Sequence, residues 1–141
     1  MLVIVSILAV VSVPVAETTM QRNKEMRLRE TLREVRTALD AFHRDWEADK
    51  LGAEVASDNG WPLNLQLLVD GVSDRDGGTQ RYLRNLPRNP FANSDDAVEV
   101  QWRILGYDDP PDAETWGGRD IYDIKPRTDQ TALDGTDVAD W

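Results

Sequence analysis

The first 50 residues constrain the fold of this chain more than any other part, because they favour one uninterrupted helix. Residues 1–16 carry no charged side chain, and residues 17–50 are densely charged. Apolar side chains continue through the charged part at steps of four and three residues, which keeps them on one side of a helix. These side chains are Leu28, Leu32, Val35, Leu39, Phe42 and Trp46. A helix of this length is roughly 70 Å long at 1.5 Å per residue, so part of it must protrude from so small a protein.

The two parts of this predicted helix require different surroundings. The uncharged part requires an apolar environment on all sides, and the charged part requires a protein partner on its apolar side. Burying six apolar side chains at about 1.5–3 kcal/mol each would fix the helix to the rest of the chain. We expect surface ion pairs between Glu25 and Arg29 and from Glu30 to nearby arginines. The helix should end between Asp49 and Gly52, with Gly52 as the stop.

The uncharged run of residues 1–16 also has to be weighed as a membrane or targeting segment. It falls short of the roughly 20 residues that cross a bilayer as a helix. It also lacks the basic start and the small-residue cleavage site of a secretory signal. A buried core helix is the other interpretation, but the densely charged residues 17–50 that continue the helix make it less favourable. We therefore predict a retained, membrane-inserting segment.

Residues 51–141 predict a small globular domain made of short elements. A short helix is expected over residues 65–71, followed by a loop rich in turn-forming residues over 73–79. Strict alternation of apolar and polar residues over 98–104 predicts a strand with Val98, Val100, Trp102 and Ile104 on one face. A second strand is expected over residues 120–124, and the tail from residue 131 is expected to be a loop. The predicted fold class is α+β, with a long protruding helix packed by its C-terminal half on a small antiparallel sheet.

Charge and cysteine content exclude several classes of function. The formal net charge is −10, and residues 51–141 carry all of it, because the basic and acidic groups of residues 1–50 balance. An acidic domain disfavours binding to nucleic acid or to anionic lipid. The chain has no Cys, so disulfides, thiolate zinc sites and Cys nucleophiles are excluded. An acidic surface is compatible with a divalent cation, and the turn-rich tail offers Asp129, Asp134 and Asp137 as calcium ligands.

Catalysis is not expected. His43 is the only histidine, and it lies on the predicted helix beside Phe42. The adjacent carboxylates Asp108 and Asp109 lie in a proline-rich turn, where neighbouring side chains point apart. Neither feature supplies two groups positioned for general acid–base catalysis, so we predict no catalytic residues and no enzymatic activity.

Three stretches together resemble the type IV pilin-like family, and most closely the major pseudopilin of bacterial type II secretion systems. The first is the uncharged start running into residues 17–25 and 32–42. The second is residues 82–91, which read Tyr-Leu-Arg-Asn-Leu-Pro-Arg-Asn-Pro-Phe. The third runs from Trp102 through residues 116–124 and 131–137 to Trp141. The second and third stretches are the more specific, and the resemblance spans nearly the whole chain.

The resemblance implies a structural subunit that polymerises into a helical pseudopilus and drives protein export. Residues 1–50 would be the helix, anchored as a single pass in the bacterial inner membrane before assembly. Residues 51–141 would form the periplasmic domain. The implied partners are other copies of the chain, minor pseudopilins and an inner-membrane assembly platform, with no nucleic acid. The side chains implied in the filament core are Leu2, Ile4, Ile7, Leu8, Val11 and Pro14.

Two points modify what the resemblance implies. Family members begin with a basic leader that is cut before a Phe-Thr-Leu-Ile-Glu sequence, and Met1 falls after the position of that glutamate. Family members also bind calcium in the corresponding C-terminal loop, which strengthens the expectation for Asp129, Asp134 and Asp137, although the match of individual ligands is poor. The alternatives are a subunit of a related pilus-like fibre, or a membrane-anchored periplasmic binding module that works as a monomer.

Overall fold

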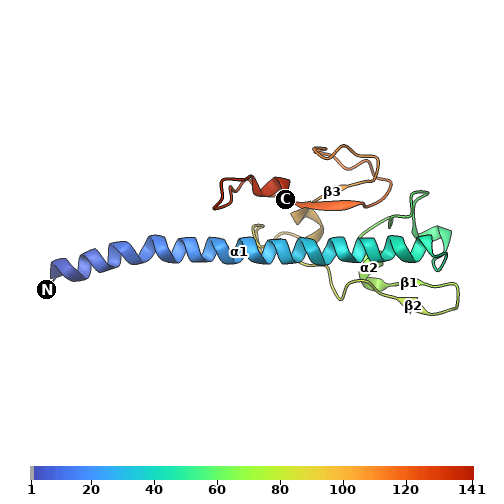
Figure 1. The fold of residues 1–141 in the computed structure, drawn as a ribbon, viewed down its shortest axis with the longest axis horizontal. Coiled ribbons are helices and arrows are strands. Elements are labelled where there is room, and N and C mark those ends of the chain that lie inside the picture. Colours follow the sequence, from blue (N-terminus) through green and yellow to red (C-terminus); the bar gives the residue numbers. More distant parts are fainter. Residues whose placement is uncertain (1) are drawn as a thin grey trace.

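The computed structural model describes residues 2–141, with side-chain surroundings from residue 14 onward. It is an α+β structure with a long N-terminal helix and a small antiparallel sheet, so the predicted fold class is confirmed at this level. Helix α1 spans Leu2–Glu47, and Pro14 lies inside it without ending it. The N-terminal end of α1 extends well beyond the rest of the chain (Figure 1).

The apolar seam of α1 packs against the domain as predicted. Five of its side chains are buried and belong to the main hydrophobic core, and Trp46 is partly buried against the same core. The five buried side chains are Leu28, Leu32, Val35, Leu39 and Phe42. The core opposite them is built from short segments of the domain, including Leu68 of α2 (Gln66–Asp70), Ile124 of β4 (Asp123–Pro126) and Val138 of the 3₁₀ helix η3 (Val138–Asp140). Burial of this seam is what holds the helix and the domain together.

The predicted filament-core side chains fall mostly outside this description. Leu2, Ile4, Ile7, Leu8 and Val11 lie outside the residues whose side chains the structure describes. Pro14 is described and is exposed. Their role in assembly stays a prediction.

The end of α1 lies earlier than predicted, and Gly52 is not its stop. Asp49 adopts a left-handed conformation with φ of 60°, two residues after the end of the helix. The backbone N–H of Lys50 donates to the carbonyl of Asp45 at 3.0 Å, and that of Asp49 donates to Trp46 at 2.9 Å. This pair of bonds is the usual way of closing a helix around one left-handed residue, and Asp tolerates that conformation better than most residues.

The segment after the helix follows the prediction in outline. The 3₁₀ helix η1 (Ala53–Val55) leads to α2, which ends at Gly71 with φ of 90°. The predicted loop forms the turn between two very short strands, β1 (Val72–Ser73) and β2 (Thr79–Gln80). The carboxylate of Asp74 organises this turn by accepting from the backbone N–H groups of Asp76 and Gly78.

Both predicted strands of the second sheet were misplaced. Residues Val98–Gln101 form the 3₁₀ helix η2, and strand β3 spans only Trp102–Leu105. Its antiparallel partner β4 begins three residues later than predicted, with Ile104 paired to Ile124. Val98 and Val100 therefore do not share a strand face, and Val100 is 58% exposed.

A buried polar pair accounts for the 3₁₀ turn. The side-chain oxygen of Gln101 accepts from the backbone N–H of Asn89 at 3.0 Å, and the side chain of Asn89 donates to the Gln101 carbonyl at 3.1 Å. Both residues are buried, so leaving these groups unpaired would be costly. These bonds fix the position of Gln101 at the end of η2, and local alternation in the sequence does not carry this information.

Candidate assembly surface

The part of α1 that the domain leaves uncovered is the first element of the candidate surface. Residues 14–20 are all exposed, and they include the large apolar side chains Val15 (62% exposed) and Met20 (63% exposed). From residue 14 onward, the first side chain of α1 to be buried is Glu25. Over the described part of the chain, no helix has the length and hydropathy needed to cross a membrane.

A polar contact fastens the C-terminal loop onto α1 where the uncovered part begins. The carboxylate of Glu25 accepts from the backbone N–H of Leu133 at 2.8 Å and from the side chain of Gln21 at 3.1 Å. Gln21 also donates to the carbonyl of Thr131 at 3.3 Å. Glu25 is only 8% exposed, so the predicted surface ion pair with Arg29 is wrong. Its side chain instead anchors a segment more than 100 residues away in sequence.

Two arginines of α1 extend this contact along the helix. The guanidinium of Arg29 lies 4.3 Å from the ring centre of Trp141 and 3.7 Å from a carboxylate oxygen of Asp134. Arg36 donates to the carboxylate of Asp123 at 2.7 Å and to the carbonyl of Trp141 at 2.7 Å. The planar guanidinium suits such divided contacts, because it carries several donors in a fixed plane. Together with Glu25, these side chains hold the chain's last segment against the helix, and we call this set the polar clamp.

We expect the Glu25→Ala variant to lose about 1–3 kcal/mol of unfolding free energy, because it removes a buried carboxylate that accepts a hydrogen bond from the backbone N–H of Leu133. Hydrogen exchange at the Leu133 amide should become faster than in the wild type. Glu30→Ala is the matched control, since Glu30 is an exposed glutamate on the same helix without an ion pair among the described residues. Unchanged exchange at Leu133 in Glu25→Ala would show that the clamp does not hold the loop.

The three aspartates predicted to bind calcium lie in this C-terminal loop, but they do not converge. Asp134 accepts from the hydroxyl of Thr136 at 2.6 Å, and this bond, aided by Arg29, holds the pKa of Asp134 below its usual value. Asp137 accepts from the backbone N–H of Ala139 and starts η3, and Asp129 accepts from Gln130. No three acidic or histidine side chains in the described residues are grouped so as to hold a metal ion. The carboxylates alone do not fit a calcium cage here, and calcium binding stays a prediction.

Thermal melting with and without a chelator tests the calcium prediction. An ion that binds only the folded chain raises the melting temperature in proportion to the logarithm of its concentration. We expect a higher midpoint in calcium than in chelator, and Asp137→Asn should reduce the difference. Equal melting midpoints in calcium and in chelator would show that the folded chain does not bind calcium.

The residues considered for catalysis have structural partners. The ring of His43 stacks on Trp61 with 4.3 Å between ring centres, and its Nδ1 lies 3.1 Å from the carbonyl of Gly60. Asp108 pairs with Arg119 at 3.2 Å. Asp109 accepts from the backbone N–H groups of Gly117 and Gly106, and these bonds lower the pKa of its carboxyl.

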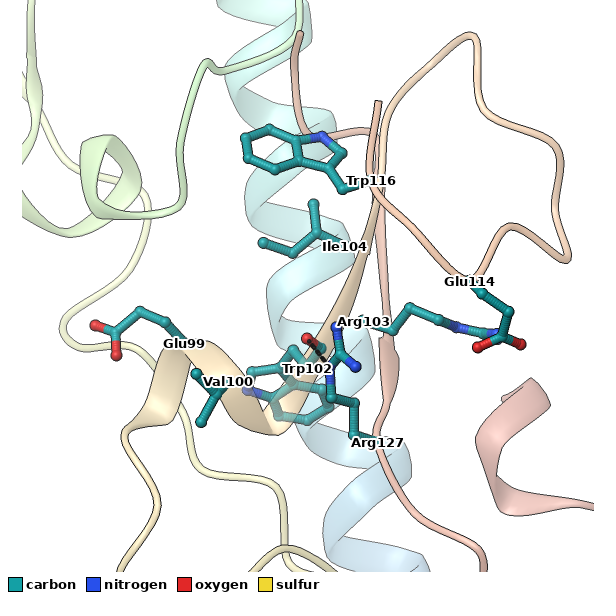
Figure 2. A pocket seen from close by; sticks show the side chains of 8 residues that line it. All are labelled: Glu99, Val100, Trp102, Arg103, Ile104, Glu114, Trp116 and Arg127. Atoms are coloured by element: carbon teal, nitrogen blue, oxygen red, sulfur yellow. Dashed lines mark hydrogen bonds and ion pairs between the residues drawn. The ribbon is translucent and has the colours of Figure 1, made fainter. Parts of the chain in front are cut away.

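A groove beside strand β3 is the second element of the candidate surface, and the sequence did not predict it. Its volume is about 400 Å³. Figure 2 shows Trp116 next to Ile104, with Val100 close to Trp102. These four side chains form the apolar floor, and charged side chains also line the groove. They are Glu99, Arg103, Glu114 and Arg127.

One ion pair and two hydrogen bonds fix the charged rim of the groove. Arg103 pairs with Glu114 at 3.0 Å and also donates to the carbonyl of Ala139. Arg127 donates to the carbonyl of Trp102 at 3.0 Å, as the dashed line in Figure 2 marks. Glu99 makes no ion pair within the described residues. The rim therefore carries an unpaired acid on one side and a basic group on the other.

Comparison with known proteins does not place the chain in a family. No family model matches it, and no solved structure matches it. A stretch of 79 residues is 34% identical to the human (Homo sapiens) CD320 antigen, covering 51% of this chain and 28% of that protein. The chain thus spans little more than a quarter of that protein, and the match shows no shared family.

Proposed function

We propose that the chain is the structural subunit of a helical filament of the pseudopilin type, which serves a type II secretion system. The observation that supports this most is the arrangement of α1. One side of its C-terminal half is buried against the domain, while its N-terminal part projects from it and includes the uncharged residues 2–16. Such a segment has no favourable state in water as an isolated helix. Packing many copies together removes it from both water and lipid.

The polar clamp supports the same proposal in a second way. A subunit that transmits load along a fibre needs its domain held rigidly on the helix, close to where the helix enters the fibre. Glu25 and Arg29 fasten the last segment of the chain at that level of α1. In this account the helix is stored in the bacterial inner membrane, the domain lies in the periplasm, and an inner-membrane assembly platform adds copies together with minor pseudopilins.

Imaging of sheared cell-surface material tests the proposal. Cells that produce a tagged chain should release thin fibres that a tag-specific antibody decorates along their length, and cells without the chain should not. A related pilus-like fibre would give the same decoration, and loss of protein export when the gene is removed would separate the two. A membrane-anchored monomeric binding module is the rival, and it predicts that the chain stays in the membrane fraction without fibres.

A further inference from the structure

An exposed row of side chains on α1 has no partner in the described structure. Arg22, Met26 and Glu30 follow one another at steps of four residues, so they form a single ridge on the helix. All three are exposed, and Met26 is 56% exposed despite its apolar side chain. Neither charged member makes an ion pair among the described residues, so the ion pairs predicted for Glu30 are wrong. We call this set the outer row.

The outer row lies on the side of α1 that faces away from the domain. Leu28 and Leu32, which belong to the opposite side, are buried. The row spans about 12 Å along the helix axis at 1.5 Å per residue. Its chemical order is a positive group, an apolar group and a negative group.

The groove beside β3 has a complementary charge order. Glu99 and Arg127 stand on opposite sides, Val100 and Trp102 of the apolar floor lie between them, and Ile104 and Trp116 extend the floor to one side of that line (Figure 2). Val100 and Trp116 are 58% and 39% exposed. A flexible thioether packs well on an aromatic ring, so Met26 suits a floor that contains Trp116. Opposite charges at both ends would fix the direction of the contact.

We propose that the outer row of one copy docks into the β3 groove of a second copy, with Met26 on the apolar floor, Arg22 toward Glu99 and Glu30 toward Arg127. The proposal rests on the proposed function, because it names the contact between copies in the fibre. The two surfaces differ, so the contact runs head to tail. A head-to-tail contact that does not close into a ring produces an open helical polymer.

An anionic lipid surface is the other partner that an exposed arginine could suggest. The outer row disfavours it for two reasons. The row includes Glu30, which such a surface repels, and it runs parallel to the helix axis. If the N-terminal end of α1 is held in a membrane and the helix stands perpendicular to it, the membrane surface lies beyond the Arg22 end of the row. The side of the row then does not face the lipid.

Cysteine cross-linking tests the contact, since the chain has no Cys of its own. A full-length chain that carries both Met26→Cys and Val100→Cys should form a ladder of disulfide-linked multimers under a mild oxidant. The matched control carries Met26→Cys with Leu63→Cys, because Leu63 is also an exposed apolar residue but lies outside the groove. The control should give no ladder.

A charge exchange provides a second measurement that does not depend on cysteine geometry. Arg22→Glu alone and Glu99→Arg alone should each lower the amount of fibre in a pelleting assay about tenfold, because each places like charges at the contact. Mixing the two variants should restore fibres, because each contact then joins opposite charges. Arg84→Glu, an exposed residue of another segment, is the control for net charge.

The outcomes separate this contact from the proposed function. Wild-type fibres without a ladder, or without rescue in the mixture, would overturn the contact and leave the filament standing. Neither fibres nor a ladder would overturn both. Loss of binding of Arg22→Glu to phosphatidylglycerol vesicles, in a chain that gives no ladder, would assign the row to lipid instead.

Discussion

Phe42→Ala is expected to lower the free energy of unfolding by about 3–5 kcal/mol, which is the usual cost of removing a large aromatic side chain from a core. Phe42 is fully buried on α1. Its ring packs edge-on against Tyr82, with 5.5 Å between ring centres. Tyr82 is in turn fixed by a hydrogen bond of 2.9 Å from its hydroxyl to Asp45 of the same helix. Few neighbours can therefore move to fill the space that the substitution leaves.

Chemical denaturation followed by tryptophan fluorescence measures this effect. The control is Thr37→Ala, an exposed position of the same helix, for which a change within about 0.5 kcal/mol is expected. A loss below 1 kcal/mol for Phe42→Ala would mean that the domain does not depend on α1 for its core. The account of α1 as both the core of the subunit and its connection to the fibre would then be wrong.

Removing residues 1–16 is expected to abolish fibre formation completely and to release the chain as a soluble monomer. The segment is uncharged, and burying its apolar side chains at about 1.5–3 kcal/mol each would be the largest favourable term in assembly. Among the side chains of α1 that the structure describes, burial begins at Glu25, so the truncated chain should keep its fold. Fractionation of cells and imaging of sheared material measure the two effects.

Charged substitutions within the same segment give an independent control. Ile7→Lys and Val11→Asp should block fibres as the truncation does, whereas Ile7→Leu should not, because it conserves volume and polarity. Melting temperatures of the truncated chain and the wild type should agree. Fibres from the truncated chain would show that assembly does not require residues 1–16.

The sequence predicted the helix and its buried face well because both depend on local periodicity. Steps of three and four residues from Leu28 to Trp46 leave only one side for the core, and a domain of this size offers only one place to bury it. The predicted turn after α2 was equally local, since Gly71 requires no side-chain partner to end the helix.

Long-range polar contacts account for what the sequence did not predict. Val98 and Val100 lie in the 3₁₀ turn that ends at Gln101, and the alternation of apolar residues does not report the pairing of Gln101 with Asn89. Asp49 closes α1, although a glycine three residues later offered a stronger signal. Strand positions were therefore wrong even though the antiparallel sheet was predicted.

The candidate assembly surface was predicted only in part. The protruding segment followed from charge patterning, but the polar clamp did not, because Glu25 and Leu133 are far apart in sequence. A usable signal was present, since Glu25 falls three residues before Leu28 and therefore on the buried side of the helix. A glutamate at such a position needs a hydrogen-bond partner, and the backbone of a distant loop supplies it.

The most direct test of the central claim is the sedimentation of the purified full-length chain after detergent is removed. The account predicts rapidly sedimenting fibres, because it proposes that the uncharged N-terminal segment of α1 packs against the same segment of other copies. A well-behaved monomer in detergent-free buffer, with that front folded onto its own domain, would contradict it.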